Sequence, residues 1–129
     1  MRTQEPRNWN REPTLPISRL TRLAVMALLV SGGAARAAEL CWTNATGGNW
    51  SVAGNWNPNQ VPGGADHAYL TNNGSYTVTV SANTAVNLLT LGGDTGTQTL
   101  ELSGGTLTLS GSGTGNAQAV LSIKGGTLA

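Results

Sequence analysis

The residues with the clearest chemical potential are three tryptophans that lie within 15 positions of one another. Trp42, Trp50 and Trp56 stand among asparagines and glycines, and the triplet Gly-Asn-Trp occurs twice, six residues apart. Exposed indole rings could stack on sugars while asparagine amides bond to sugar hydroxyls, because an indole combines a large apolar face with a polar edge. The same rings could instead cap a repeat protein, whose terminal units must cover an otherwise open core. We favour the cap and keep the ligand platform as the alternative.

The titratable side chains give little support for catalysis. Hydrolysis of a glycosidic bond needs two carboxyl groups across one sugar, and the carboxylates after residue 37 are scattered at Glu39, Asp66, Asp94 and Glu101. His67 is the only histidine, and no cysteine or glutamate accompanies it at a metal-ligand spacing. We expect Asp66 and His67 to be a turn residue and a surface residue. The sequence therefore predicts no catalytic residue, no cofactor and no enzymatic activity.

Two other kinds of site are also disfavoured. Residues 92–96 (Gly-Gly-Asp-Thr-Gly) resemble part of a calcium-binding nonapeptide but lack its G-G-x-G-x-D order, so we predict no metal site. The formal net charge is +1 for the whole chain, yet six arginines and two glutamates give residues 1–37 a charge of +4. The remaining 92 residues hold four acids and only Lys124, a charge of −3. Nucleic-acid binding needs clustered lysine and arginine, so we expect no nucleic-acid partner.

The first 37 residues have the pattern of a secretory signal peptide. A polar stretch with five arginines precedes the apolar run of residues 23–30, and Ala35-Arg36-Ala37 supplies an A-x-A cleavage site. The apolar run is far shorter than the ~20 residues that a membrane-spanning helix needs. We therefore predict a helical signal peptide over 1–37, cleavage after Ala37 and export of a chain that begins at Ala38.

Residues 38–64 are rich in tryptophan, asparagine and glycine. Pro58 and Pro62 exclude a central strand, because proline cannot donate to a ladder, so we expect irregular structure with one short strand near Trp42. Cys41 is the only cysteine, which rules out an intrachain disulfide. We expect it to be a small buried hydrophobe.

Residues 65–129 alternate with a period of two, which is typical of strands. Tyr76, Val78 and Val80 form an apolar face, while threonines lie between them. Asn72-Asn-Gly74 lies between two such runs and predicts a hairpin or a tight turn. Glycine pairs separate the later runs, and no helical period follows the leader.

A phrase in this region repeats. Residues 102–107 (Leu-Ser-Gly-Gly-Thr-Leu) recur as residues 123–128 (Ile-Lys-Gly-Gly-Thr-Leu), 21 positions later, and residues 91–93 (Leu-Gly-Gly) form a weaker copy half a period upstream. A repeat of this length matches one coil of a solenoid. The composition favours a narrow parallel β-helix with a core of stacked Leu, Val and Ile.

The sequence stops at Ala129, directly after the phrase of the last copy, so we expect residues 65–129 to be an incomplete β-helix at the front of a longer protein. An open C-terminal end would expose Leu107, Leu121 and Leu128, and uncovered strand edges pair with other chains. We therefore expect residues 38–129 to self-associate.

The order of these motifs resembles the N-terminal segment of bacterial autotransporter-like surface proteins, many of which carry autotransporter-associated β-strand repeats. The resemblance covers residues 42–129 and rests on Trp42 and residues 47–51, 55–56, 61–64, 66–70, 76–80 and 88–93. It implies a right-handed parallel β-helix displayed outside the cell, as an adhesin or matrix component. Such proteins are held at the outer membrane by a C-terminal barrel or anchor, which these 129 residues do not include.

Three functions follow from this interpretation. The first is a secreted or cell-surface structural and adhesion protein that meets extracellular polysaccharide or other cell-surface molecules. The second is a carbohydrate-binding module that uses Trp42, Trp50 and Trp56. The third is the non-catalytic front of a polysaccharide-acting β-helix enzyme, which would need charged residues clustered on one face of later coils.

Overall fold

The structure of this protein is a computed structural model that describes residues 36–129. The predicted signal peptide falls almost entirely on residues 1–35, outside the described residues, and stays a prediction. Within residues 36–129 no helix has both the length and the apolar character needed to cross a bilayer.

Almost all regular structure in the described residues is strand, which confirms the all-β class. Within residues 36–129 one 3-10 helix lies between the strands near the tryptophans. The elements are β1 (Glu39–Trp42), β2 (Gly48–Asn49), η2 (Ala53–Asn55), β3 (Trp56–Asn57), β4 (His67–Leu70), β5 (Tyr76–Val80), β6 (Thr84–Val86), β7 (Leu88–Leu91), β8 (Gln98–Leu102), β9 (Thr106–Leu109), β10 (Gly113–Gly115), β11 (Ala119–Ile123) and β12 (Thr127–Leu128).

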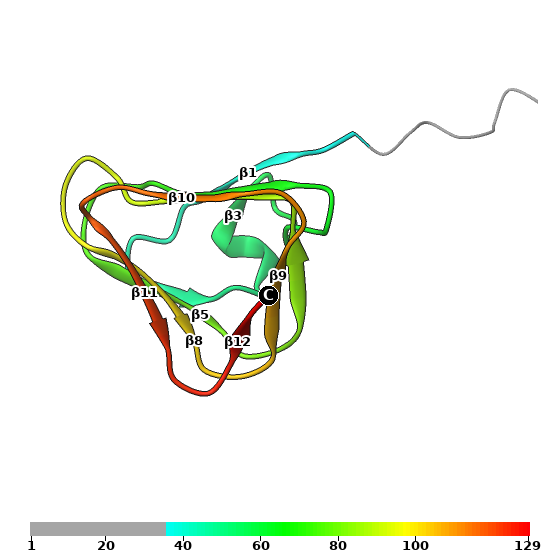
Figure 1. The fold of residues 1–129 in the computed structure, drawn as a ribbon. Coiled ribbons are helices and arrows are strands. Elements are labelled where there is room, and N and C mark those ends of the chain that lie inside the picture. The colour runs from blue at the N-terminus through cyan, green and yellow to red at the C-terminus, as the bar shows by residue number, and fades with distance from the viewer. Residues whose placement is uncertain (1–35) are drawn as a thin grey trace, which may run out of the picture. The chain divides into compact units, whose positions relative to one another are not determined.

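The strands form three sheets, with the orders β10-β7-β4-β1-β3, β11-β8-β5-β2 and β12-β9-β6. Every pair is parallel except β1 with β3, which is antiparallel. From β4 onward, each set of three consecutive strands enters the three sheets in the same order. We call these sets the first circuit (β4–β6), the second circuit (β7–β9) and the third circuit (β10–β12). In Figure 1 the path of the chain has a triangular outline, with one sheet along each side.

The two copies of the repeated phrase lie in register on neighbouring strands of the second and third circuits. Ile123 pairs with Leu102 on β8, and Leu128 pairs with Leu107 on β9. Between the first two circuits the offset is 21 residues for β4 and β7, 22 for β5 and β8, and 23 for β6 and β9. The corners between strands absorb these differences, so each sheet keeps its own register. The weaker copy at residues 91–93 is not a further coil, because it forms the corner between β7 and β8 of one circuit.

Side chains alternate between the interior and the surface, as the period of two predicts. On β5 the residues Tyr76, Val78 and Val80 are buried, and the threonines between them face outward. Parallel register places like on like, so Val78 lies beside Leu100, and Val80 beside Leu102. Leu100 and Leu102 are fully buried, and each such leucine contributes about 1.5–3 kcal/mol relative to an exposed one.

The Asn-Asn-Gly sequence at residues 72–74 forms a tight corner and not a hairpin. Its flanking strands β4 and β5 belong to different sheets, so the chain turns aside after Leu70 and does not fold back. Gly74 has a φ of +108° and Gly96, at the same corner one circuit later, has +83°. Only glycine adopts such angles at little cost.

A buried amide joins these two corners. Gln98 is fully buried; its Oε1 accepts from the Gly93 N–H at 2.7 Å, and its Nε2 donates to the carbonyls of Thr95, at 3.0 Å, and of Gly74. A buried polar group is tolerated where its hydrogen bonds are satisfied. Gln98 therefore links consecutive corners through its hydrogen bonds.

Two burial predictions were wrong. Cys41 is exposed, because Leu40 and Trp42 take the inward positions of β1 and the residue between them must face outward. Leu107 is fully buried, since the third circuit already covers β9 through β12. The strand near Trp42 is confirmed as β1. The expectation of a single strand in residues 38–64 was wrong, since β2 and β3 also lie there.

Candidate functional site

The three tryptophans form one buried aromatic cluster. Trp42 and Trp56 pair directly across the antiparallel strands β1 and β3, with ring centroids 5.1 Å apart and planes at 89°. Trp50 meets Trp56 edge-on at 4.8 Å, and Tyr76 of the first circuit stacks on Trp42 at 6.5 Å. The relative exposures of Trp42, Trp50 and Trp56 are 0%, 2% and 1%. Stacking on a sugar needs an accessible ring face, and these rings have none.

The asparagines around the cluster bond to the protein itself. Asn44 Nδ2 donates to Asn55 Oδ1 at 3.0 Å, and Asn55 Nδ2 donates to the Asn49 carbonyl at 3.2 Å. Asn49 Oδ1 accepts from both the N–H and the hydroxyl of Ser51. Both Gly-Asn-Trp triplets therefore direct the tryptophan inward and use the asparagine to fix the loop. The free amides and exposed rings that the ligand-platform alternative requires are not present in this segment.

Two polar atoms in and beside this cluster are buried without a hydrogen-bond partner, Trp50 Nε1 and the Tyr76 hydroxyl. By contrast, Trp42 Nε1 donates to the Asn44 carbonyl at 2.7 Å and Trp56 Nε1 to the Trp50 carbonyl at 2.9 Å. Burial raises the pKa of Tyr76 above its usual 10.0, and the Asn72 backbone offsets part of the rise.

The carboxylates do not come together. Glu39 lies on β1, Asp94 at an exposed corner and Glu101 on β8. Glu101 forms an ion pair with Lys124, with 2.7 Å between Oε2 and Nζ. Exposed pairs of this kind contribute about 0–1 kcal/mol. Among residues 36–129 no three His, Cys, Asp or Glu side chains are close enough to hold a metal ion.

Asp66 closes a turn with Gly63, as expected, because its N–H donates to the Gly63 carbonyl at 2.9 Å, and it is in addition buried. The residue is 8% exposed, and its carboxylate accepts the Ala38 N–H at 2.9 Å and the Gly63 N–H at 2.8 Å. Its backbone carbonyl accepts from Asn87 and Leu88 of the next circuit. The partners lie up to 28 residues away in the sequence, so no local motif could have predicted this role. His67 is half-buried at the start of β4, and its N–H donates to the Ala38 carbonyl.

The two ends of the strand stack differ. The tryptophan cluster, β1, β2 and β3 lie beyond the first circuit, whereas β10, β11 and β12 are the last strands of their sheets at the opposite end. Large apolar side chains on β11 and β12 are exposed there, with relative exposures of 46% for Leu121, 55% for Ile123 and 37% for Leu128. This confirms the exposure expected of Leu121 and Leu128. We call the surface formed by β10, β11 and β12 the open end.

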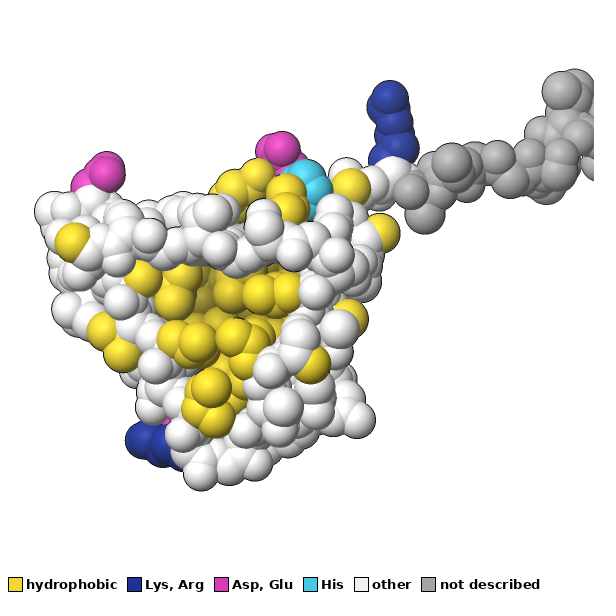
Figure 2. Space-filling model, viewed as in Figure 1, with side chains coloured by type: hydrophobic (Ala, Val, Ile, Leu, Met, Phe, Trp, Pro, Cys, Tyr) yellow, Lys and Arg dark blue, Asp and Glu magenta, His cyan; other side chains and the backbone are white. Residues whose placement is uncertain are grey.

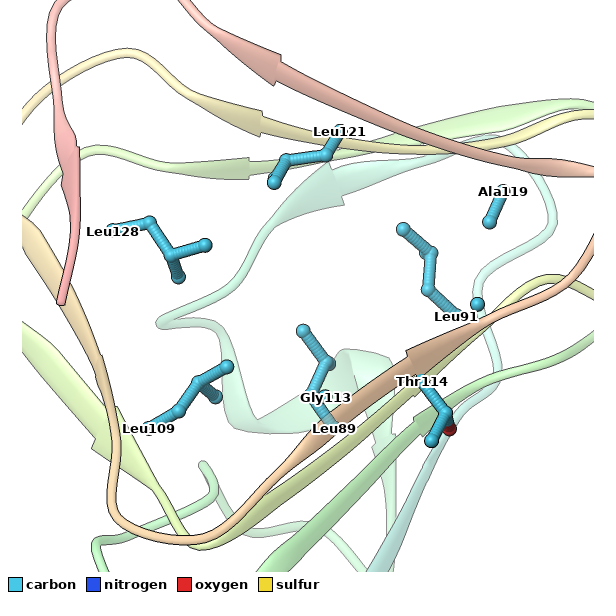
Figure 3. Close-up of a pocket in the computed structure, with 9 residues that line it drawn as sticks. Leu89, Leu91, Leu109, Gly113, Thr114, Ala119, Leu121 and Leu128 are labelled. Carbon is cyan, nitrogen blue, oxygen red and sulfur yellow. The ribbon is translucent and has the colours of Figure 1, made fainter.

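The open end contains an apolar hollow of about 330 Å³. Figure 2 shows hydrophobic side chains inside the hollow and polar or backbone atoms around its rim. In Figure 3 leucines from β7, β9, β11 and β12 project toward one another across it, namely Leu89, Leu91, Leu109, Leu121 and Leu128.

Glycines on β10 cause the hollow. Gly113 pairs with Leu89 and Gly115 with Leu91, whereas the corresponding inward residues of β4 are Ala68 and Leu70. On one side of β7, β4 places Ala68 and Leu70 beside Leu89 and Leu91. On the other side, β10 places only glycines there. The hollow is the uncovered interior of the stack, and it holds no polar group suited to catalysis.

No family model, no curated protein and no solved structure matches this chain. The site must therefore be interpreted from its own geometry.

Proposed function

We propose that this chain belongs to an exported, cell-surface structural protein of the autotransporter-like kind, which acts by display and adhesion and catalyses no reaction. In this proposal residues 65–129 are coils of a right-handed parallel β-helix, and residues 38–64 are its N-terminal cap. The observation that carries the proposal is the pairing of like residues between successive circuits, because stacked repeats of about 20 residues build elongated scaffolds.

The outward faces support a display role. Thr77 of β5 lies beside Thr99 of β8, and Thr90 of β7 beside Thr114 of β10, where the two hydroxyls are 3.5 Å apart. Each pair joins two successive circuits, and the neighbouring positions are taken by Val120 beside Thr99 and by Tyr69 beside Thr90. Such a surface suits hydrogen bonding to extracellular polysaccharide or to other cell-surface molecules.

The test is to express the full chain with its leader in a bacterial host and to follow its location by adding protease to intact cells. We expect the chain to become accessible outside the cytoplasmic membrane, and cells that export it to attach to polysaccharide-coated surfaces more than control cells. The control is the same chain started at Ala38 behind an initiating methionine. Retention of the full chain in the cytoplasm contradicts export, and attachment equal to the control contradicts adhesion.

When these 129 residues are produced on their own, the open end supports self-association with a second copy. Three strand edges and the exposed side chains of Leu121, Ile123 and Leu128 lie on one surface, and unpaired edges template pairing with another strand. The opposite end is filled by buried tryptophans, so two copies would meet through their open ends. This gives a closed dimer of isologous type and not a filament.

Sedimentation tests this arrangement. We expect Ile123→Lys to shift the full chain toward monomer, because a charge would lie in the contact. Val52→Lys is the matched control, since Val52 is 49% exposed and lies in the N-terminal segment. A monomeric wild-type chain at all concentrations, or an equal effect of both substitutions, contradicts the dimer.

A further inference from the structure

The buried carboxylate of Asp66 lies against the first residue that the predicted cleavage would leave. Ala38 Nα is 2.9 Å from Asp66 Oδ1, and the Ala38 carbonyl accepts from the His67 N–H at 2.8 Å. Ala38 is half-buried, whereas Arg36 and Ala37 are exposed. The bond between Ala37 and Ala38 therefore lies where the chain leaves the folded surface.

Cleavage changes the chemistry of this one nitrogen. A signal peptidase adds water across the Ala37–Ala38 peptide bond, so that Ala37 keeps the new carboxylate and Ala38 keeps the new amine. An α-amino group ordinarily has a pKa of about 7.7–8.0, so this amine binds a proton at neutral pH. The neutral amide N–H that donates to Asp66 becomes an ammonium with a full positive charge and three donors.

We propose that Asp66 is the binding site for the α-ammonium of Ala38, so that removal of the leader creates an ion pair within the folded protein. The site is already formed: the second carboxylate oxygen accepts the Gly63 N–H at 2.8 Å, and Asp66 is 8% exposed. Among residues 36–129 no lysine, arginine or histidine side chain forms an ion pair with Asp66. The new N-terminus supplies the missing cation.

The consequence is that the processed chain is more stable than its precursor. The carboxylate already accepts the amide N–H of the precursor, and cleavage adds to that bond the attraction of a full positive charge, which strengthens it. The pair also attaches β1 to the loop before β4, which holds the tryptophan-bearing strand against the first circuit. The proposal depends on cleavage after Ala37, which is part of the proposed export, but not on adhesion.

The first measurement is the intact mass and N-terminal sequence of the protein exported from the full chain. We expect the product to begin at Ala38. A product that begins at any other residue overturns the proposal, because its ammonium would not be the group beside Asp66. This outcome leaves the proposed export intact, so the two failures are distinguishable.

The second measurement combines a chemical modification of that product with a substitution, so that the coupling between the two changes is obtained. Urea unfolding is compared before and after acetylation of the amines, in the wild type and in Asp66→Asn. Acetylation removes the charge and leaves an N–H that resembles the uncleaved amide. Lys124, the only lysine, is acetylated in both proteins, so its effect cancels.

We expect acetylation to raise the unfolding equilibrium constant of the wild type about tenfold or more, and that of Asp66→Asn less than threefold. Equal effects in both proteins overturn the proposal. If Asp66→Asn does not fold, the wild type alone still decides: an unchanged equilibrium constant on acetylation overturns the ion pair.

Discussion

Substitution of Gly96 tests whether the circuits stack through their corners. Gly96 has a φ of +83°, and a Cβ added there would overlap the backbone carbonyl group of Gly74 in the preceding circuit. Both atoms of that carbonyl are main chain and cannot move aside without moving the corner. An L-residue in the left-handed region costs about 1–2 kcal/mol, and overpacking against fixed atoms costs about 1–3 kcal/mol. We therefore expect Gly96→Ala to lower the free energy of unfolding by about 2–5 kcal/mol.

Two matched variants separate the causes. Gly74 has a positive φ of +108°, but a Cβ added there would meet no atom within 4 Å, and the same open space surrounds Gly54, whose φ is not positive. Gly74→Ala should thus cost only the backbone term of about 1–2 kcal/mol, and Gly54→Ala should stay within about 0.5 kcal/mol of the wild type.

The assay is urea unfolding of the full chain, followed by the fluorescence of the buried tryptophans. With a slope of about 1–3 kcal/mol per molar urea, the cost at Gly96 shifts the midpoint by about 1 M or more. If Gly96→Ala costs no more than Gly74→Ala, the two corners are not in contact and the reasoning is refuted. A large effect of Gly54→Ala would show that added methyl groups destabilise this chain unspecifically.

Three further substitutions address the aromatic cluster and the open end. Tyr76→Phe should raise the free energy of unfolding by about 1 kcal/mol, because it removes an unpaired buried hydroxyl. Burial raises the pKa of the Tyr76 hydroxyl in the folded protein, so the unfolded chain loses this proton more readily and the wild type loses stability as the pH rises above 10. Tyr76→Phe has no such proton, so its free energy of unfolding should fall less over the same pH range. Parallel curves of stability against pH for the two proteins would contradict this. Trp50→Ala should lower the free energy of unfolding by about 3–5 kcal/mol. Under conditions where the variant is folded, we expect insoluble polysaccharide to retain it as much as the wild type. A loss of retention without a loss of stability would support the ligand-platform alternative. Gly113→Ala should stabilise the chain by about 0.5–1 kcal/mol, since the methyl group lies in the hollow 3.2 Å from the movable Cδ1 of Leu109; a loss of stability in the same assay would show that the leucine cannot yield.

Much of the local structure could be predicted because it follows from short-range patterns. The alternation in residues 76–80 determines which side of β5 is buried, and the recurrence of residues 102–107 at residues 123–128 appears as the register between circuits. The strand near Trp42 also follows from local sequence. These features need no knowledge of distant partners.

The features that sequence could not supply depend on distant contacts. The Asn-Asn-Gly signal at residues 72–74 fits both a hairpin and a corner, and the choice depends on which strands lie beside β4 and β5. The roles of Asp66 and Gln98 depend on partners up to 28 residues away. The direction of the tryptophan rings depends on β1 pairing with β3. Because β3 has only two residues, its sequence does not predict this pairing.

The register has a consequence for how such a gene can change. The two copies of the phrase at residues 102–107 and 123–128 occupy paired positions on neighbouring strands. Unequal crossing-over between the corresponding DNA segments adds or deletes 21 codons in frame. Each product gains or loses a whole turn of chain through all three sheets while every remaining side chain keeps its face. The molecule can therefore lengthen by recombination in steps of one turn, with no new fold to be selected.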